Sequence, residues 1–255
     1  MAKLANLRIV NTRPKERADA LIHALMQQGA TVLALPLLET TPLLLSPQAQ
    51  DYLHNLDSYD GVFIVSPTAA SLGLKALADY WPQWPVAIGW LAIGQSTAEL
   101  MRDYGIDAIV PLQETSEGLL QLPQLQSLKK GQRLLVLRGE GGRNLVRDNL
   151  QNQGVNVDYV NLYQRQLPQE SRQQWQDIQQ QIDVVIITSG ETLAQWQQMA
   201  GEPAKNTPML VISPRLVNLA QQQGFKNVIS SASIKPDDIV TALCQWHDAH
   251  TQNLT

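Results

Sequence analysis

Three short segments of this 255-residue chain each occur twice. LRIVNTRP pairs with LLVLRGEGGR, DGVFIVSPTAA with DVVIITSGETL, and AIGQSTAELMRDYGI with VISPRLVNLAQQQGF. Because separations this similar are hard to obtain by chance, the repeat predicts two copies of one folding unit, which agrees with a prior of roughly 150 residues per domain. The main aligned pairs are Arg13 with Arg138, Ser66 with Ser189 and Gly94 with Ser213, and they are separated by 125, 123 and 119 residues. The same alignment also pairs Asp60 with Asp183, Gly29 with Gly154 and Gly105 with Gly224.

Short runs rich in Val, Ile and Leu alternate with longer segments of helical spacing along the whole chain. Runs without polar alternation are typical of strands buried on both faces, and parallel strands need crossover connections between them. The sequence therefore predicts an α/β protein with parallel sheets covered by helices on both faces. The expected strands are LRIV, TVLAL, GVFIV, WLAI, AIV, RLLVL, VNVDYV, DVVII, MLVI and NVI.

The charge balance narrows the possible partners. The chain has 19 Lys and Arg against 23 Asp and Glu, so its net charge of −4 creates no positive field for nucleic acid or an anionic membrane. The single cysteine, Cys244, excludes an intramolecular disulfide and a CxxC site. We find no apolar run long enough for a signal peptide or a membrane span. We expect a cytoplasmic protein that binds any anionic ligand through local features.

Polar or small residues follow several expected strands directly and begin the next helix. The carboxyl ends of parallel strands are where open α/β sheets bind ligands, and helix amino ends there offer unpaired N–H groups to an anion. These residues can equally serve only as helix caps, and that alternative stays open. The candidate ligand-binding residues at these turns are Ser66, Thr68, Thr97, Ser189, Gly190 and Ser213.

Arginines gather at the same strand ends. A guanidinium pairs with a carboxylate or phosphate in bidentate fashion, although a surface ion pair is the alternative for any single arginine. The segment LRGEGGR lacks the spacings of the known phosphate loops. The candidates are Arg13 and Arg138, with Arg17, Arg143, Arg147, Arg165 and Arg215 nearby.

The usual catalytic and metal-binding patterns are missing from the sequence. The four histidines, His23, His54, His247 and His250, stand beside no Cys or carboxylate at ligand spacing, and no GxSxG or HExxH occurs. An enzyme with this sequence is therefore expected to work without a metal or a strong nucleophile. Two alternatives come from other classes. One is a two-domain protein that binds an anionic small molecule without chemistry, and the other is a sugar-nucleotide transferase.

Eight short strings follow one another along the chain, namely NTRP, IVSPTAA, AIGQSTAELM, ETSEGLL, LRGEGGR, NLYQRQ, ITSGETL and SPRLVNLAQQQGF. In the order and spacing of these strings the chain resembles, over nearly its whole length, the family of the uroporphyrinogen-III synthases. It implies two similar doubly wound parallel-sheet domains with a cleft between them, one inserted into the other. The implied bounds are 1–36 with 168–255 for the first domain, 41–162 for the second, and 37–40 with 163–167 for a two-stranded connector, whereas a tandem repeat would divide the chain near Lys130.

The resemblance also implies an activity. The family substrate, hydroxymethylbilane, is a linear tetrapyrrole with eight carboxylates, which loses its terminal hydroxyl as water and closes through a spiro intermediate with ring D inverted. The implied enzyme needs no cofactor and no metal, is a monomer, and has the preceding enzyme, hydroxymethylbilane synthase, as a candidate partner. Because the free bilane is expected to cyclise without inversion, the protein must mainly steer the chain, and orientation can supply much of ~7–11 kcal/mol.

Roles for individual residues come from the same resemblance. Tyr163 matches the family tyrosine and becomes the candidate proton donor to the departing hydroxyl, with packing of the connector as the alternative. Thr97, Ser66 and Ser189 match residues that hydrogen-bond substrate carboxylates. The turn Ser213-Pro214-Arg215-Leu216 lacks the threonine usual in the family, so Arg215 is expected to make the contact there.

Overall fold

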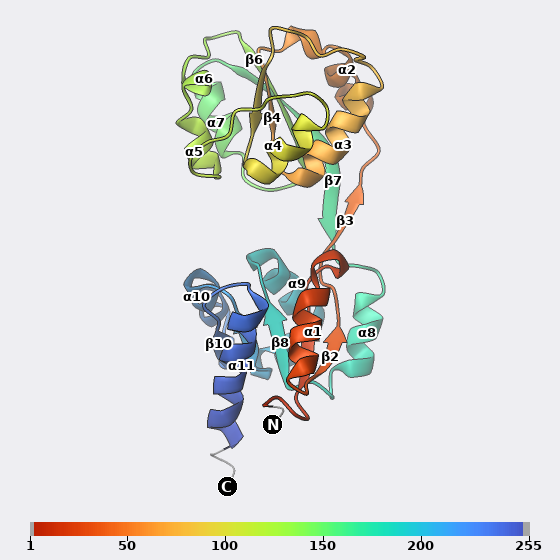
Figure 1. Cartoon of the computed structure of the whole chain (residues 1–255), viewed down its shortest axis with the longest axis vertical. Helices are drawn as coiled ribbons and strands as arrows, with labels where there is room; N and C mark the ends of the chain where they lie inside the picture. Colours follow the sequence, from red (N-terminus) through yellow and green to blue (C-terminus); the bar gives the residue numbers. More distant parts are fainter. Residues whose placement is uncertain (1–2, 252–255) are drawn as a thin grey trace. The chain divides into compact units, whose positions relative to one another are not determined.

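The computed structural model describes residues 3–251, which form two compact units. Unit 1 contains the residues up to Glu39 together with those from Gln166 onward, and unit 2 contains Thr40–Arg165. Each unit has a five-stranded sheet. Figure 1 shows the strands and helices of each unit. The predicted α/β class is confirmed, because the strands that alternate with helices pair in parallel. Among the described residues, no helix has the length and hydropathy needed to span a bilayer.

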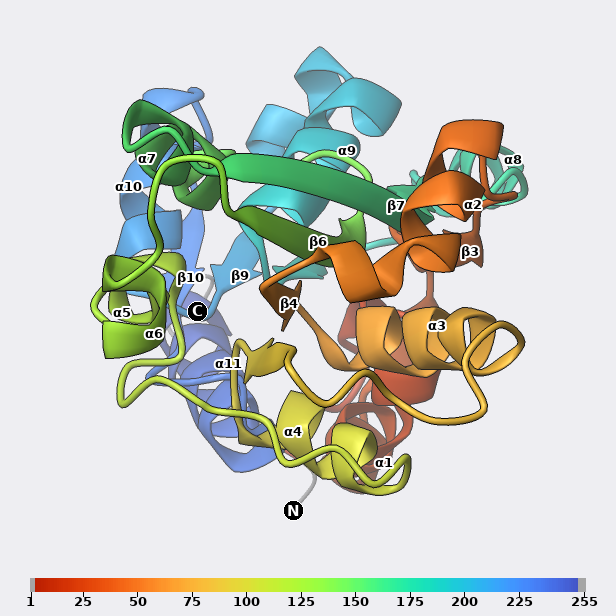
Figure 2. The same cartoon turned by 90° about the horizontal axis from the view of Figure 1, so that it is seen from above.

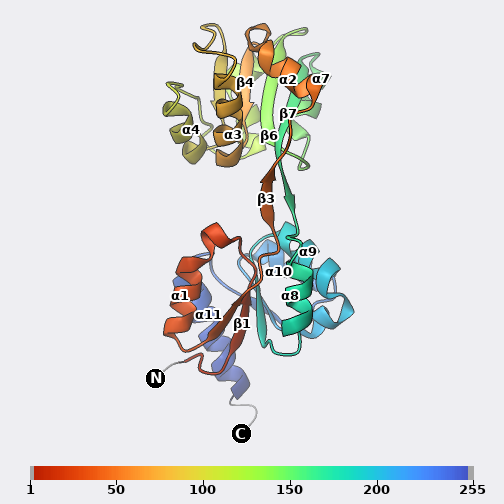
Figure 3. The same cartoon turned by 90° about the vertical axis from the view of Figure 1, so that its right-hand side faces the viewer.

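The sheet of unit 1 has the strand order β10-β9-β8-β1-β2. Its strands are β1 (Arg8–Asn11), β2 (Thr31–Ala34), β8 (Val184–Ile187), β9 (Met209–Val211) and β10 (Val228–Ser230). One face is covered by α1 (Asp19–Gln27) and α11 (Pro236–Thr251), and the other by α8 (Ser171–Ile178), α9 (Gly190–Ala200) and α10 (Pro214–Gln222), as Figure 3 shows. The short helices η1 (Lys15–Arg17) and η3 (Glu202–Asn206) complete the unit.

Alternation along the strands of unit 1 gives the sheet two apolar faces. Val10 and Val185 pack with the fully buried Trp196 of α9, whereas the neighbouring Ile9 and Val184 pack toward α1 and α11. Successive strand residues point to opposite faces, so a strand that is apolar at every position is buried on both sides. This explains why the sequence runs lack polar alternation.

The sheet of unit 2 has the order β3-β7-β6-β4-β5. Its strands are β3 (Glu39–Pro42), β4 (Gly61–Ile64), β5 (Gly89–Ala92), β6 (Arg133–Gly139) and β7 (Asn156–Gln166). One face packs against α2 (Pro47–His54), α3 (Pro67–Ala78) and α4 (Gln95–Arg102), and the other against α5 (Ser116–Leu120), α6 (Pro123–Gln126) and α7 (Leu145–Asn152). Figure 2 shows α3 and α4 on one side of this sheet and α7 on the other. The short helix η2 (Leu56–Ser58) precedes β4.

Each unit combines halves of the two sequence repeats. Unit 1 joins β1 and β2 of the first copy to β8, β9 and β10 of the second, and unit 2 joins β4 and β5 of the first copy to β6 and β7 of the second. The orders β9-β8-β1-β2 and β5-β4-β6-β7 then correspond strand for strand. A division near Lys130 would separate β5 from the β6 that completes its sheet, so the tandem interpretation does not describe the folded units.

The repeated glycines lie just after equivalent helices. Gly29 and Gly154 follow α1 and α7 with φ of 86° and 81°, and Gly105 and Gly224 follow α4 and α10 with φ of 73° and 89°. A positive φ favours glycine because it has no Cβ to clash with the backbone. The sequence alignment therefore marks where each helix stops and the chain turns into the next strand.

The repeated aspartates, Asp60 and Asp183, lie at the amino ends of β4 and β8, whereas the serine turns lie at the carboxyl ends of these strands. The Asp183 carboxylate accepts a hydrogen bond of 2.7 Å from the Arg8 backbone N–H, and Asp60 accepts one of 2.8 Å from the Arg133 N–H. Arg8 and Arg133 are the first residues of the equivalent strands β1 and β6. The aspartates thus satisfy the donor that begins each central strand, which is a structural role.

We expect Asp183→Ala to lower the free energy of unfolding by about 1 kcal/mol, because the Arg8 N–H loses its acceptor. Asp183→Asn keeps an acceptor oxygen and is expected to lose less. The measurement is urea unfolding, with Asp177→Ala, an exposed position on α8, as the control that changes stability by less than about 0.5 kcal/mol. Equal stability of Asp183→Ala and the wild type would contradict the structural role.

A buried tyrosine lies beside an ion pair at the amino end of β6. Tyr59 donates to Asp158 Oδ2 at 2.8 Å, and the Arg133 guanidinium donates to the same oxygen at 2.9 Å. Burial, followed by the hydrogen bond to Asp158, raises the pKa of Tyr59. The folded protein therefore holds the phenol proton more tightly than the unfolded chain, in which tyrosine titrates near pH ~10.

This shift predicts a loss of stability at alkaline pH. The contribution of Tyr59 is fully present below pH ~10 and is lost as the pH rises toward its higher folded pKa. We expect urea unfolding between about pH 9 and about pH 11 to show a shallower decline in Tyr59→Phe than in the wild type or in the exposed control Tyr80→Phe. Identical slopes in the three proteins would refute this assignment.

Candidate functional site

Four helices begin at the carboxyl ends of parallel strands, where the sequence placed them. The hydroxyl oxygens of Ser66, Ser189 and Ser213 accept the N–H three residues further on, at 3.0, 3.0 and 3.3 Å. The serines therefore cap α3, α9 and α10, so the capping interpretation applies to them. A capping hydroxyl still has its proton to donate, and the adjoining helix amino ends carry partial positive charge.

Ser66 makes a second contact that links it to Tyr163. The Ser66 Oγ and the Tyr163 Oη lie 3.0 Å apart, within hydrogen-bond distance. Tyr163 belongs to β7 within unit 2, where it pairs with Gly139 of β6, and it is only 3% exposed. The structure thus places a phenolic hydroxyl at the carboxyl end of β4, beside the amino end of α3.

Gly139 makes room for the Tyr163 ring. A Cβ atom on Gly139 would lie 2.5 Å from Tyr163 Cζ, well inside the distance that real Cβ atoms keep. The Arg165 guanidinium carbon lies 5.6 Å from the ring centroid. The ring therefore occupies space that a side chain at position 139 would fill, and the Arg165 guanidinium lies near the ring.

Thr97 lies in the first turn of α4 and is completely buried. Its Oγ1 has no hydrogen-bond partner among the described residues. A buried hydroxyl without a partner costs free energy, which a ligand or ordered water would recover. Thr68, the other threonine expected in unit 2, is partly exposed in the first turn of α3.

The expected residues of unit 1 divide into turn residues and arginines. The Ser189 hydroxyl also lies 2.8 Å from Thr192 Oγ1, and Gly190 opens α9. Arg13 follows β1, and partial burial together with the charge of Arg17 lowers the pKa of its guanidinium. Arg215 is exposed in the first turn of α10. The structure brings these four residues, together with Ser213, to the ends of the adjacent strands β1, β8 and β9.

Arg138 is more enclosed than the sequence suggested. It is 8% exposed at the end of β6, and its guanidinium donates to Gly139 O at 3.0 Å and Asn144 Oδ1 at 3.3 Å. Its guanidinium carbon and that of Arg147 each lie 4.6 Å from the Tyr159 ring centroid. None of the ion pairs among residues 3–251 includes Arg138. The side chain orders the loop after β6 and leaves its charge uncompensated.

Arg143 has the alternative role of a surface ion pair. It donates to Glu117 of α5 at 2.6 Å, and this bond lowers the pKa of the exposed Glu117 carboxyl. Such a pair contributes little to stability in water.

Sequence reasoning missed two residues beside the expected ones. Tyr159 stacks with Arg138 and Arg147 from an ordinary strand position, which carries no sequence signal. Glu114 accepts the Gln95 N–H at the amino end of α4 at 2.9 Å. Glu114 belongs to the string ETSEGLL, which is part of the family resemblance, but nothing in that string indicates a contact with Gln95, nineteen residues earlier in the chain.

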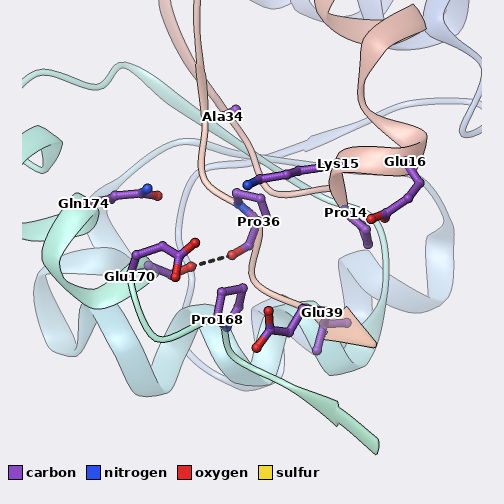
Figure 4. Close-up of a pocket in the computed structure, with 11 residues that line it drawn as sticks. Pro14, Lys15, Glu16, Ala34, Pro36, Glu39, Pro168, Glu170 and Gln174 are labelled. Atoms are coloured by element: carbon purple, nitrogen blue, oxygen red, sulfur yellow. Dashed lines mark hydrogen bonds between the residues drawn. The ribbon is translucent and has the colours of Figure 1, made fainter. Parts of the chain in front are cut away.

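A pocket of about 150 Å³ lies in unit 1, where the chain leaves β2 and returns before α8. Figure 4 shows Pro36 and Pro168 close together in it, with Glu39, Glu170 and Lys15 around them. The buried Ser171 hydroxyl donates to the Pro36 carbonyl at 2.7 Å and ties the two segments to each other. With more carboxylates than cations in its lining, the pocket does not suit a polyanion.

Within the described part of the chain, no group of three His, Cys, Asp or Glu side chains could hold a metal ion. The histidines lie on α1, α2 and α11.

The fold and these turns define a class, namely two-unit α/β proteins whose strand ends offer hydroxyls, helix amino ends and arginines. The family model described as uroporphyrinogen-III synthase HemD matches residues 19–241. The chain is 32% identical over 246 residues to the uroporphyrinogen-III synthases of Escherichia coli K12 and Salmonella typhimurium LT2, covering 92% of this chain and 99% of each relative. The chain therefore belongs to the uroporphyrinogen-III synthase family, a family of enzymes.

Solved structures agree with the fold. A mutant uroporphyrinogen III synthase from Thermus thermophilus gives a TM-score of 0.66 at 15% identity, covering 96% of this chain and 99% of that one. The enzyme from Helicobacter pylori 26695 gives 0.53 at 14% identity, covering 94% and 99%. The two-unit α/β architecture is therefore shared with these proteins.

Proposed function

We propose that this chain is the enzyme that converts hydroxymethylbilane into uroporphyrinogen III in tetrapyrrole biosynthesis. The observation that carries the proposal is the family match over residues 19–241, together with full-length relatives of that name. The strand-end turns add physical support, because they offer donors suited to a molecule that carries eight carboxylates.

The substrate-binding groups we propose are those at the strand ends. Backbone N–H groups in the first turns of α3, α4, α9 and α10 and the hydroxyls beside them favour carboxylates through both hydrogen bonds and the helix dipole. Arg138 adds a positive charge that no carboxylate of the described residues compensates. The proposed set is Arg13, Ser66, Thr68, Thr97, Arg138, Ser189, Gly190, Ser213 and Arg215.

Tyr163 is the proposed catalytic residue. Its phenol would give a proton to the terminal hydroxyl of the bilane, which departs as water and leaves an azafulvenium on ring A. The substituted carbon of ring D then attacks to form the spiro intermediate, which fragments and recloses with ring D inverted. The final loss of a ring proton returns a proton to the phenolate, so that only water is released overall. The Ser66 contact of 3.0 Å holds the phenol in place for the first step.

The protein contributes mainly by positioning in this proposal. The electron-rich pyrrole assists the departure of the protonated hydroxyl, so the product isomer depends on which carbon of ring D reaches ring A. Fixed contacts to many carboxylates can impose that geometry. We also propose that the chain acts as a cytoplasmic monomer and receives the bilane from hydroxymethylbilane synthase, because a free bilane would cyclise without inversion.

The decisive experiment is an isomer analysis. The purified protein is incubated with freshly made hydroxymethylbilane, the product is oxidised, and the uroporphyrin isomers are separated. We expect isomer III to dominate. Isomer I alone would reject the enzyme assignment and favour a protein that only binds the anion.

A further inference from the structure

The amino end of α4 is occupied by a carboxylate from another part of the chain. Glu114, in the segment before α5, accepts the backbone N–H of Gln95, the first residue of α4, at 2.9 Å. The buried Gly94 lies directly beneath it, since a Cβ atom there would lie 2.6 Å from Glu114 Cδ. The absence of a side chain at Gly94 is therefore what lets a carboxylate reach this helix end.

This arrangement differs from the other three turns. Helices α3, α9 and α10 are each capped by a serine of their own, whereas Gly94 has no side chain to offer α4. A carboxylate at a helix amino end gains both a charge-assisted hydrogen bond and the dipole interaction. The turn thus has the chemistry of a carboxylate site, and it holds a carboxylate.

An independent observation at the same turn concerns Thr97. The Thr97 hydroxyl is fully buried and has no partner among the described residues, although Glu114 already bonds to Gln95. Helical side chains lean toward the amino end of their helix, so the side chain of the third residue of α4 leans toward the Gly94 turn. Glu114 leaves this hydroxyl unsatisfied, which a differently placed carboxylate could correct.

We propose that Glu114 is the resting occupant of a carboxylate site at the amino end of α4, and that a carboxylate of the substrate displaces it. The inference deepens the proposed function and rests on it for the identity of the ligand. Glu114 is exposed and is tied to the helix by its hydrogen bond to the Gln95 N–H, so its release requires little rearrangement.

Such an occupant would make the site selective for ligands that carry several carboxylates. A tethered carboxylate competes at an effective concentration in the millimolar range or above, which a single free carboxylate cannot match at low concentration. A ligand anchored through several other carboxylates can displace it. If Glu114 holds the site about nine-tenths of the time, the apparent affinity of the ligand falls about tenfold. Glu114 is thereby a specificity residue for polycarboxylates.

The first test uses propionate as a probe and needs no activity. In Glu114→Ala, sodium propionate should fill the vacated site and raise the melting temperature in a saturable way by about 3 °C at constant ionic strength. The wild type and the control Glu99→Gln, which removes an exposed charge from the same helix, should not respond. Equal responses in all three proteins, or none in Glu114→Ala, would overturn the proposal.

A double variant checks that propionate binds at this turn. In Gly94→Ala/Glu114→Ala the added methyl group takes the place of the carboxylate, so the response to propionate should disappear. A response that persists in the double variant would place propionate elsewhere and would also overturn the proposal.

The second test uses hydroxymethylbilane. Glu114→Ala should lower KM about three- to tenfold with kcat unchanged, because removing the competing side chain improves binding equally in the ground and transition states. A raised KM would show that Glu114 only caps α4. If the wild type makes no uroporphyrinogen III, the proposed function fails, and the propionate titration still decides whether the site exists.

Discussion

Tyr163→Phe is expected to lower kcat about 100-fold for the conversion of hydroxymethylbilane, with KM little changed. The substitution removes only the hydroxyl, while the ring keeps its packing against Gly139. The loss of the bond to Ser66 should lower the free energy of unfolding by about 1 kcal/mol. Initial rates and urea unfolding measure the two effects separately.

Two control variants sharpen this prediction. Tyr104→Phe removes a hydroxyl from an exposed tyrosine of unit 2 and should leave kcat unchanged. Ser66→Ala leaves the Tyr163 phenol in place but removes the hydrogen bond that orients its hydroxyl. This variant should therefore lose less activity than Tyr163→Phe. Wild-type turnover in Tyr163→Phe would leave Tyr163 with packing alone, which was the alternative from the sequence.

Gly139→Ala is expected to be more damaging than the loss of the hydroxyl itself. The new methyl group would overlap the Tyr163 ring, with 2.5 Å to Cζ, and the ring and β7 must then move. Overpacking of this kind costs about 1–3 kcal/mol of stability. Because the displaced ring carries the hydroxyl away from Ser66, kcat should fall at least as far as in Tyr163→Phe.

The matched control is Gly89→Ala on the edge strand β5. Its Cβ would meet only the Asp60 carbonyl at 3.5 Å, an ordinary contact, so stability and activity should stay near wild type. Thermal unfolding and initial rates are measured on both variants. A Gly139→Ala protein with wild-type stability and turnover would show that the ring is not held as the structure indicates.

Much of the fold could be predicted because parallel strands that are buried on both faces appear in the sequence as continuous apolar runs. The runs LRIV, GVFIV and DVVII became β1, β4 and β8. The run AIV forms only an isolated parallel bridge from Ile109 to Leu91. The strand β3 was invisible to this pattern, because its residues ETTP are polar and only half covered.

The site was predictable in part for a similar reason. A serine between a strand and a helix is a local signal, so Ser66, Ser189 and Ser213 could be placed from the sequence alone. The contact of Ser66 with Tyr163 joins residues 97 positions apart, and it depends on the pairing of β6 with β7. The enclosure of Arg138 depends on the loop that folds over it, which local patterns do not describe.

The exchange of halves between the two repeats has a consequence for synthesis on the ribosome. Unit 2 is continuous in the chain and can close as soon as β7 has emerged. Strands β1 and β2 are made first but must wait for β8, β9 and β10, which come last. During this interval their backbone edges and apolar faces have no native neighbour, which is when an unfinished sheet is most prone to wrong pairing. During synthesis, unit 2 in the middle of the chain therefore completes its sheet before unit 1, which contains both ends of the chain.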